Sequence, residues 1–102
     1  MIIESMIREH NYCSVVACTP EYVYNAWIRG NTLYFYILSD DKITDVIYHF
    51  TARIRNGKIK LVFGSVAFTL YSHDELINTI KYAFPESWHD IMTILETLLY
   101  VE

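Results

Sequence analysis

The sequence predicts a single α+β domain over residues 1–102, with a twisted antiparallel sheet packed on one face by two C-terminal amphipathic helices. Three observations support this prediction. Apolar and polar residues alternate with a period of two through much of residues 43–63. Asn56-Gly57 interrupts that alternation with the residue pair that most strongly favours a two-residue hairpin turn. Beyond Ser72 the apolar spacing changes to three and four residues, which is typical of helices.

The composition is that of a folded domain. Hydrophobic residues make up 53% of the 102 residues and charged residues 20%, so the chain has enough apolar surface for one core. No apolar run approaches the roughly 20 residues that a membrane span needs. The N-terminal residues also lack the basic and apolar regions of a signal peptide. We therefore expect a cytoplasmic protein that does not enter a membrane.

The first segment predicts a short helix followed by a strand. Apolar residues within 2–7 recur at helical spacing, and Glu4 and Arg8 lie four residues apart, as in a helical ion pair. Residues 12–18 form a β-branched and apolar run that predicts a strand. The two cysteines of this run are five residues apart, so a strand would send them to opposite faces, where they cannot form a disulfide.

Residues 21–29 fit either a helix or a strand. Thr19-Pro20-Glu21 is typical of a helix start, and Gly30 could end that helix. Against this, the aromatic and β-branched residues of 22–28 favour a strand, and Gly30-Asn31 favours a hairpin turn into a strand at 32–39. We favour the hairpin.

Residues 43–70 predict a second hairpin. Between residues 43 and 55 one face carries Val46, Tyr48, Phe50, Ala52 and Ile54. After the turn at Asn56-Gly57 the alternation continues along a strand that reaches residue 70, with a bulge at Gly64. The predicted sheet is thus a meander of about four to five strands.

Two helices complete the predicted fold. Ser72 and Glu75 form a capping box, and an apolar stripe runs from Leu76 to Phe84 before Pro85 ends the helix. A second helix begins near Glu86, and its apolar stripe is expected to bury Trp88, Ile91, Met92, Leu95, Leu98 and Leu99.

No catalytic, cofactor or metal motif is found. The sequence contains neither a glycine-rich phosphate loop, nor a nucleophile elbow, nor a zinc helix. His10-x-x-Cys13 has metal-like spacing but lacks a second close pair, which a zinc site would need. His73-Asp74 and His89-Asp90 fall in predicted first helical turns, where aspartates are favoured by the helix dipole. We therefore expect a protein that is not an enzyme.

One face of the sheet is a candidate binding surface. The predicted hairpins place Trp27 opposite Tyr34, Arg53 opposite Lys60 and Arg55 opposite Lys58, and like charges in such positions are destabilising. Trp, Tyr and Arg are the residue types that dominate binding hot spots. The candidate partner-binding residues are Trp27, Tyr34, Tyr36, His49, Arg53, Arg55, Lys58 and Lys60. The competing interpretation is that the aromatic residues simply suit strands and that the N-terminal helix covers Trp27.

The net charge is −4 and the isoelectric point is near 5.5, values that suit a small acidic interaction protein. We predict that it binds a macromolecular partner, preferably a protein, and inhibits or neutralises it, as immunity proteins and phage anti-CRISPR proteins do. In this hypothesis the carboxylates at 74, 75, 86, 90 and 96 mimic phosphates, and the aromatic face is the apolar anchor.

Two alternatives remain open. In the first, the sheet binds nucleic acid, with bases stacked on its aromatic residues and phosphates held by the 53–60 hairpin. In the second, the chain is a homo-oligomeric module, such as a homodimer, in which Ile94, Tyr100 and Val101 meet across a two-fold axis.

Overall fold

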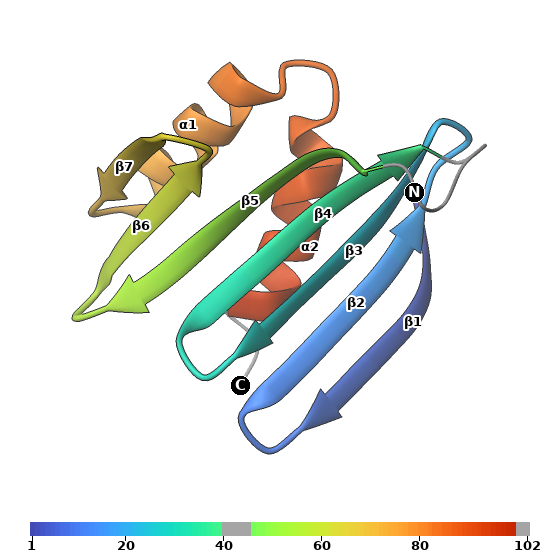
Figure 1. The fold of residues 1–102 in the computed structure, drawn as a ribbon, viewed down its shortest axis with the longest axis horizontal. Helices are drawn as coiled ribbons and strands as arrows, with labels where there is room; N and C mark the ends of the chain where they lie inside the picture. The colour runs from blue at the N-terminus through green and yellow to red at the C-terminus, as the bar shows by residue number, and fades with distance from the viewer. Residues whose placement is uncertain (40–45, 100–102) are drawn as a thin grey trace.

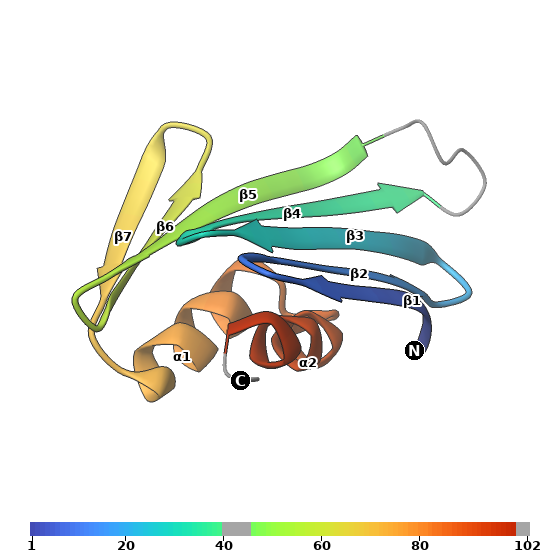
Figure 2. The same ribbon diagram turned by 90° about the horizontal axis from the view of Figure 1, so that it is seen from below.

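The computed structural model describes residues 1–39 and 46–99. Seven strands form one antiparallel sheet in which each strand pairs with its neighbours in chain order (Figure 1). The strands are β1 (Ile2–Glu9), β2 (Tyr12–Cys18), β3 (Tyr22–Arg29), β4 (Thr32–Ser39), β5 (Val46–Arg55), β6 (Lys58–Phe63) and β7 (Val66–Leu70). The helices α1 (His73–Ala83) and α2 (Trp88–Leu99) lie against one face, here called the inner face. The opposite, outer face carries no second layer within the described residues (Figure 2).

The α+β class is confirmed, but the strand count is higher than the four to five predicted. The predicted N-terminal helix is wrong, because residues 2–9 form strand β1. A helix of this length is marginal alone, whereas pairing with β2 gives the segment a ladder of backbone hydrogen bonds. Asn11 supplies the turn with a φ of 62°, a left-handed conformation that asparagine tolerates. Consequently no N-terminal helix covers Trp27.

The predicted bulge at Gly64 is also wrong. Gly64-Ser65 is a two-residue hairpin turn, so the predicted strand 58–70 divides into β6 and β7, which pair with Phe63 opposite Val66. Gly64 has a φ of 60°, and Gly-Ser is one of the pairs that favour such a turn. The turn at Asn56-Gly57 is confirmed, with φ values of 52° and 76°.

The ambiguous segment 21–29 is a strand, as the hairpin interpretation predicted. β3 pairs with β4 in the predicted register, in which Ala26 faces Phe35 and Trp27 faces Tyr34. Residues 43–45 of the strand predicted over 43–55 lie outside the described residues, and β5 begins at Val46.

The prediction that alternate residues of β5 form one buried face is confirmed only in part. Phe50 and Ala52 are buried, but Val46 and Tyr48 are 47% and 57% exposed. The pairing of β4 with β5 shifts in register between Ile37 and Leu38, which disturbs the alternation at this end of the strand. Tyr48 instead packs edge-on against Phe84 at the end of α1, with the ring centroids 5.4 Å apart.

The core lies between the inner face and the helices. Phe50 is at its centre: its ring stacks on Phe35 at 4.9 Å and packs at a tilt against Phe63 at 5.2 Å and Phe84 at 5.8 Å. Aromatic contacts of this kind add about 0.5–1.5 kcal/mol each to the stability gained from burial. Leu76 and Ile80 of α1 are also buried.

The buried residues of helix α2 differ from those that its apolar stripe predicted. Ile94, which the homo-oligomer hypothesis placed on an exposed side, is fully buried, while Trp88 and Leu99 are only partly buried. Ile94 is therefore not available for a two-fold contact, since the sheet and α1 already surround the helix. Tyr100 and Val101, the other two residues of that hypothesis, lie outside the described residues. Neither helix is long and apolar enough to cross a membrane.

Strand β1 forms one edge of the sheet, and two features disfavour further strand pairing there. A register shift between Ile3 and Ser5 disturbs the edge, and Arg8 places a charge on the inner side, because its β2 partner Cys13 belongs to the inner face. Both are common devices against edge-to-edge aggregation. Cys13 and Cys18 lie on opposite faces and form no disulfide, as predicted.

The N-terminus of α1 gives a test of the fold. The Ser72 hydroxyl accepts a hydrogen bond from the Glu75 backbone N–H at 3.2 Å, and the Glu75 carboxylate accepts one from the Tyr71 N–H at 3.1 Å. We expect Ser72→Ala to lower the free energy of unfolding by about 1 kcal/mol, because a helix N–H loses its partner. Urea denaturation measures this. Ser65→Ala, in the exposed β6–β7 turn, is the matched control and should change stability by less than about 0.5 kcal/mol; equal effects would contradict the capping role.

Candidate functional site

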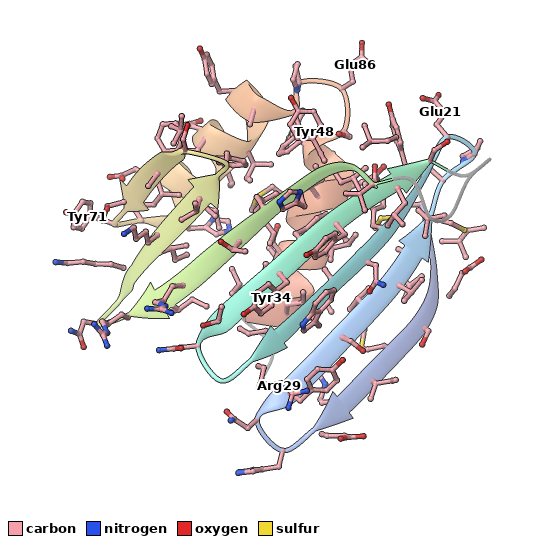
Figure 3. All side chains as sticks on the ribbon, viewed as in Figure 1. Glu21, Arg29, Tyr34, Tyr48, Tyr71 and Glu86 are labelled. Atoms are coloured by element: carbon pink, nitrogen blue, oxygen red, sulfur yellow. The ribbon has the colours of Figure 1, made fainter. Side chains whose placement is uncertain are left out.

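The eight predicted partner-binding residues all lie on the outer face. Their faces follow from strand pairing, since the intervening residues Ala26, Phe35, Phe50 and Ala52 are buried on the inner side. The register places Tyr36 opposite His49 and Arg53 opposite Lys60, across three adjacent strands. Figure 3 looks onto this face, with Tyr34 on β4 and Arg29 near the end of β3.

Four of these residues form an aromatic row, defined as Trp27, Tyr34, Tyr36 and His49. Trp27 stacks on Tyr34 at 5.3 Å and on Tyr36 at 5.4 Å, and the Trp27 and Tyr36 rings are parallel within 1°. His49 stacks on the other side of Tyr36 at 5.5 Å. The rings thus cover part of one another's faces, which leaves Trp27, Tyr34 and Tyr36 half-buried although no second layer covers them.

The other four form a basic end, defined as Arg53, Arg55, Lys58 and Lys60. Arg53 and Lys60 border a hollow of about 270 Å³ beside the Tyr34 ring, with Thr32, Thr51, Ala52 and Val62 as its other walls. No carboxylate of the described residues pairs with any of the four cations, while Lys58 lies 5.4 Å from the centroid of the Tyr71 ring. The like charges therefore stand opposed without local neutralisation.

Charge divides sharply between the two layers. Within the described residues, strands β3–β7 carry Arg29 and the basic end but no carboxylate. The helical layer beyond Ser72 carries five carboxylates and one cation, Lys81. The acidic residues of the helical layer and the aromatic face lie on opposite sides of the sheet, so a single partner that contacts both sets would have to reach around the sheet.

The histidine motifs gain no support for chemistry. His73-Asp74 and His89-Asp90 lie in the first turns of α1 and α2, as predicted. Among the described residues, no group of three His, Cys, Asp or Glu side chains is close enough to hold a metal ion.

Sequence reasoning missed a pocket at the other end of the sheet, between the β2–β3 turn and the start of α2. This corner pocket is lined by Thr19, Pro20, Glu21, Tyr22, Tyr24, Glu86, Ser87 and Asp90 and has a volume of about 210 Å³. Glu21 and Glu86 come from distant parts of the sequence but lie at the same upper end of the molecule in Figure 3. No local pattern could bring the turn and the helix together.

Tyr24 is the unusual residue of the corner pocket. Its side chain is fully buried, and its hydroxyl has no hydrogen-bond partner of acceptable geometry. Burial, and then the negative charge of Asp90, raise the pKa of Tyr24 to about 12, while the nearby Ser87 hydroxyl opposes the shift. An unsatisfied buried hydroxyl costs about 1–3 kcal/mol, so this group calls for an explanation.

Comparison with known proteins gives no evidence about the function of these surfaces. No protein-family model, curated protein or solved structure matches the chain. The functional argument therefore depends on the two surfaces themselves.

The opposed cations of the basic end predict that this face is not optimised for stability. We expect Lys60→Glu to raise the free energy of unfolding by about 0.5–1 kcal/mol at low salt, because it replaces a repulsive cross-strand pair with an attractive one. Lys60→Gln, which only removes the repulsion, should give a smaller gain. Urea denaturation at two salt concentrations measures both, and a less stable Lys60→Glu protein would show that Lys60 has a structural role.

The raised pKa of Tyr24 predicts that the folded protein loses stability in strong base. The unfolded tyrosine ionises near pH 10, whereas the folded residue has a pKa of about 12. Its contribution is therefore complete below pH 10 and is lost as the pH rises towards 12, up to about 3 kcal/mol. Denaturant unfolding of the wild type and Tyr24→Phe across this range isolates the effect from the other tyrosines. Tyr82→Phe, at an 86% exposed position, should retain the wild-type slope; a Tyr24→Phe profile parallel to the wild type would refute the prediction.

Proposed function

We propose that this chain is a non-catalytic binding domain whose outer face docks on an acidic surface of a protein partner. The aromatic row beside the unneutralised basic end is the observation that carries the proposal. Aromatic residues and arginine supply most of the binding energy in protein interfaces. Because the basic end lacks internal carboxylate partners, an acidic partner would relieve the repulsion between Arg53 and Lys60.

The stacked rings favour docking in a second way. Each ring of the aromatic row is held by its neighbours at 5.3–5.5 Å, so it has little rotamer freedom left to lose on binding. Side chains ordered in advance reduce the entropy cost of association. Trp27 and Tyr36 can therefore act as rigid anchors.

A protein partner is favoured over nucleic acid for a geometric reason. Base stacking requires free ring faces, but Trp27 and His49 cover part of both faces of Tyr36. The edges and polar groups of the rings remain, and these suit the side chains of a protein surface. A domain of this kind acts by occupying its partner, which is how a stoichiometric inhibitor of the immunity-protein or anti-CRISPR type would work.

The test is partner capture followed by measured affinity. Wild-type protein and the variants Trp27→Ala and Arg53→Glu are used as baits in an extract of the native host, and any partner lost with both variants is purified. We expect Trp27→Ala to weaken binding by at least about thirtyfold and Arg53→Glu by about tenfold, as hot-spot and interfacial charge residues do. The affinity should also fall as salt rises.

Arg8→Glu is the matched control, since it makes the same charge change on the inner side of β1, away from the outer face. Its affinity should stay within about twofold of the wild type. The inhibitory role is tested by adding the domain to the purified partner and measuring that partner's activity at equimolar concentration. A partner that binds Trp27→Ala and Arg53→Glu as tightly as the wild type would place its interface elsewhere.

Nucleic-acid binding and self-association are competing outcomes of the same experiments. Fluorescence anisotropy with single-stranded RNA and DNA at low salt would overturn the protein-docking proposal if binding is seen and is lost in Arg53→Ala and Lys60→Ala. Light scattering that shows a concentration-dependent dimer disrupted by Trp27→Ala would assign the outer face to a second copy of the chain.

A further inference from the structure

We propose that the corner pocket binds an organic cation: the ammonium group of an amine or of a lysine side chain. This surface is separate from the outer face, so the inference goes beyond the proposed function and does not depend on it. The pocket joins three carboxylates to one buried and unpartnered hydroxyl, and its ligand class follows from those groups.

The carboxylates come from three parts of the chain. Glu21 lies in the β2–β3 turn, Glu86 in the α1–α2 connection and Asp90 in the first turn of α2, and all three line the same pocket. The other lining residues with polar side chains are Thr19, Ser87 and the two tyrosines Tyr22 and Tyr24. No lysine or arginine is among the lining residues, so the pocket contains no cation of its own.

Tyr24 lines the same pocket as these carboxylates. The charges of Asp90 and Glu21 raise the pKa of the Tyr24 hydroxyl and the Ser87 hydroxyl lowers it, and these three residues also line the pocket. The side chain is fully buried, so bulk solvent does not satisfy its hydroxyl. A ligand in the pocket would satisfy a group that the protein leaves without a partner.

The chemistry of the lining selects an ammonium ion. An ammonium has three N–H donors and no acceptor, whereas the carboxylates and the Tyr24 oxygen can all accept. The N-terminus of α2 opposes a cation with only about half a unit of positive charge, which three carboxylates outweigh. A metal ion fits less well, because no three such ligands in the described part of the chain converge closely enough to hold one.

Thr19 fixes the backbone of the β2–β3 turn, which forms one wall of the pocket. Its hydroxyl accepts hydrogen bonds from the backbone N–H groups of Glu21 at 3.2 Å and Tyr22 at 3.0 Å. The Thr19 N–H also donates to the Tyr22 carbonyl at 2.8 Å. The turn that presents Glu21 is thus held by three hydrogen bonds, so the carboxylate projects from a fixed backbone.

The test is a titration of the intact chain with n-butylammonium chloride, followed by NMR. We expect saturable shifts of the backbone amides of Glu21, Tyr22 and residues 86–90 at neutral pH, where the probe carries its positive charge. Asp90→Asn should weaken binding by about tenfold, because one charge-assisted hydrogen bond is lost. Tyr24→Phe should also weaken it, while retaining the ring that fills the core.

Glu96→Gln is the matched control, since it removes a carboxylate from the exposed side of α2, outside the pocket, and should leave the affinity unchanged. Butanol tests for binding by the apolar chain alone. Shifts that do not saturate, that appear equally with butanol, or that survive in both Asp90→Asn and Tyr24→Phe would overturn the proposal.

Two further probes identify the source of the cation once the site is established. Tighter binding of Nα-acetyl-lysine methylamide than of spermidine would assign the pocket to a lysine side chain of a protein, and the reverse order would assign it to a free polyamine. Because all these probes are small, their results are independent of whether a protein docks on the outer face.

Discussion

The two C-terminal helices cover one face of a seven-stranded sheet, and most properties of the molecule follow from the other face being left open. Side chains alternate between the faces of a strand, so each of strands β2–β7 contributes to both a packed core and an exposed surface, while the edge strand β1 is exposed along its whole length. On the inner side Phe35 and Phe50 stack beneath the helices. On the outer side no layer of protein is present in the described residues, and large side chains there must reduce their contact with water in another way.

The side chains of the aromatic row reduce their contact with water by stacking on one another. By stacking across β3, β4 and β5, its rings bury part of their surface against one another and brace the centre of the sheet. Cross-strand aromatic pairs stabilise sheets by about 0.2–1 kcal/mol each, so the row has structural value even without a partner. Its proposed role in docking rests on what lies beside it, since the opposed cations Arg53 and Lys60 have no comparable structural benefit.

The uneven distribution of charge between the sheet and the helical layer makes the two sides of the molecule electrostatically different. Among the described residues, most cations lie on strands β3–β6 and most carboxylates lie in the helical layer, while the remaining carboxylates are Glu4 and Glu9 of β1 and Glu21 in the β2–β3 turn. Such a distribution orients a charged partner during encounter more than it strengthens the final complex. It also means that the outer face and the corner pocket favour ligands of opposite sign. Tyr34 of the outer face lies well away from Glu21 and Glu86 of the corner pocket in Figure 3.

Local patterns in the sequence determined much of this fold. The hairpin pairs Gly30-Asn31 and Asn56-Gly57, the period-two alternation of β3–β6 and the capping serine of α1 all act over a few residues, and so they could be read without the structure. They also determined which residues share the outer face, because a known turn sets the register of both strands. Strand β1 was missed since its apolar spacing over eight residues is also helical, and only pairing with β2 decides between the two. The corner pocket and the open outer face were decided by the tertiary structure alone. Both depend on where α2 packs, since this helix brings Asp90 into the same pocket as Tyr24 and lies on the face opposite Trp27. Packing between segments so distant in sequence leaves no local pattern from which it could be predicted.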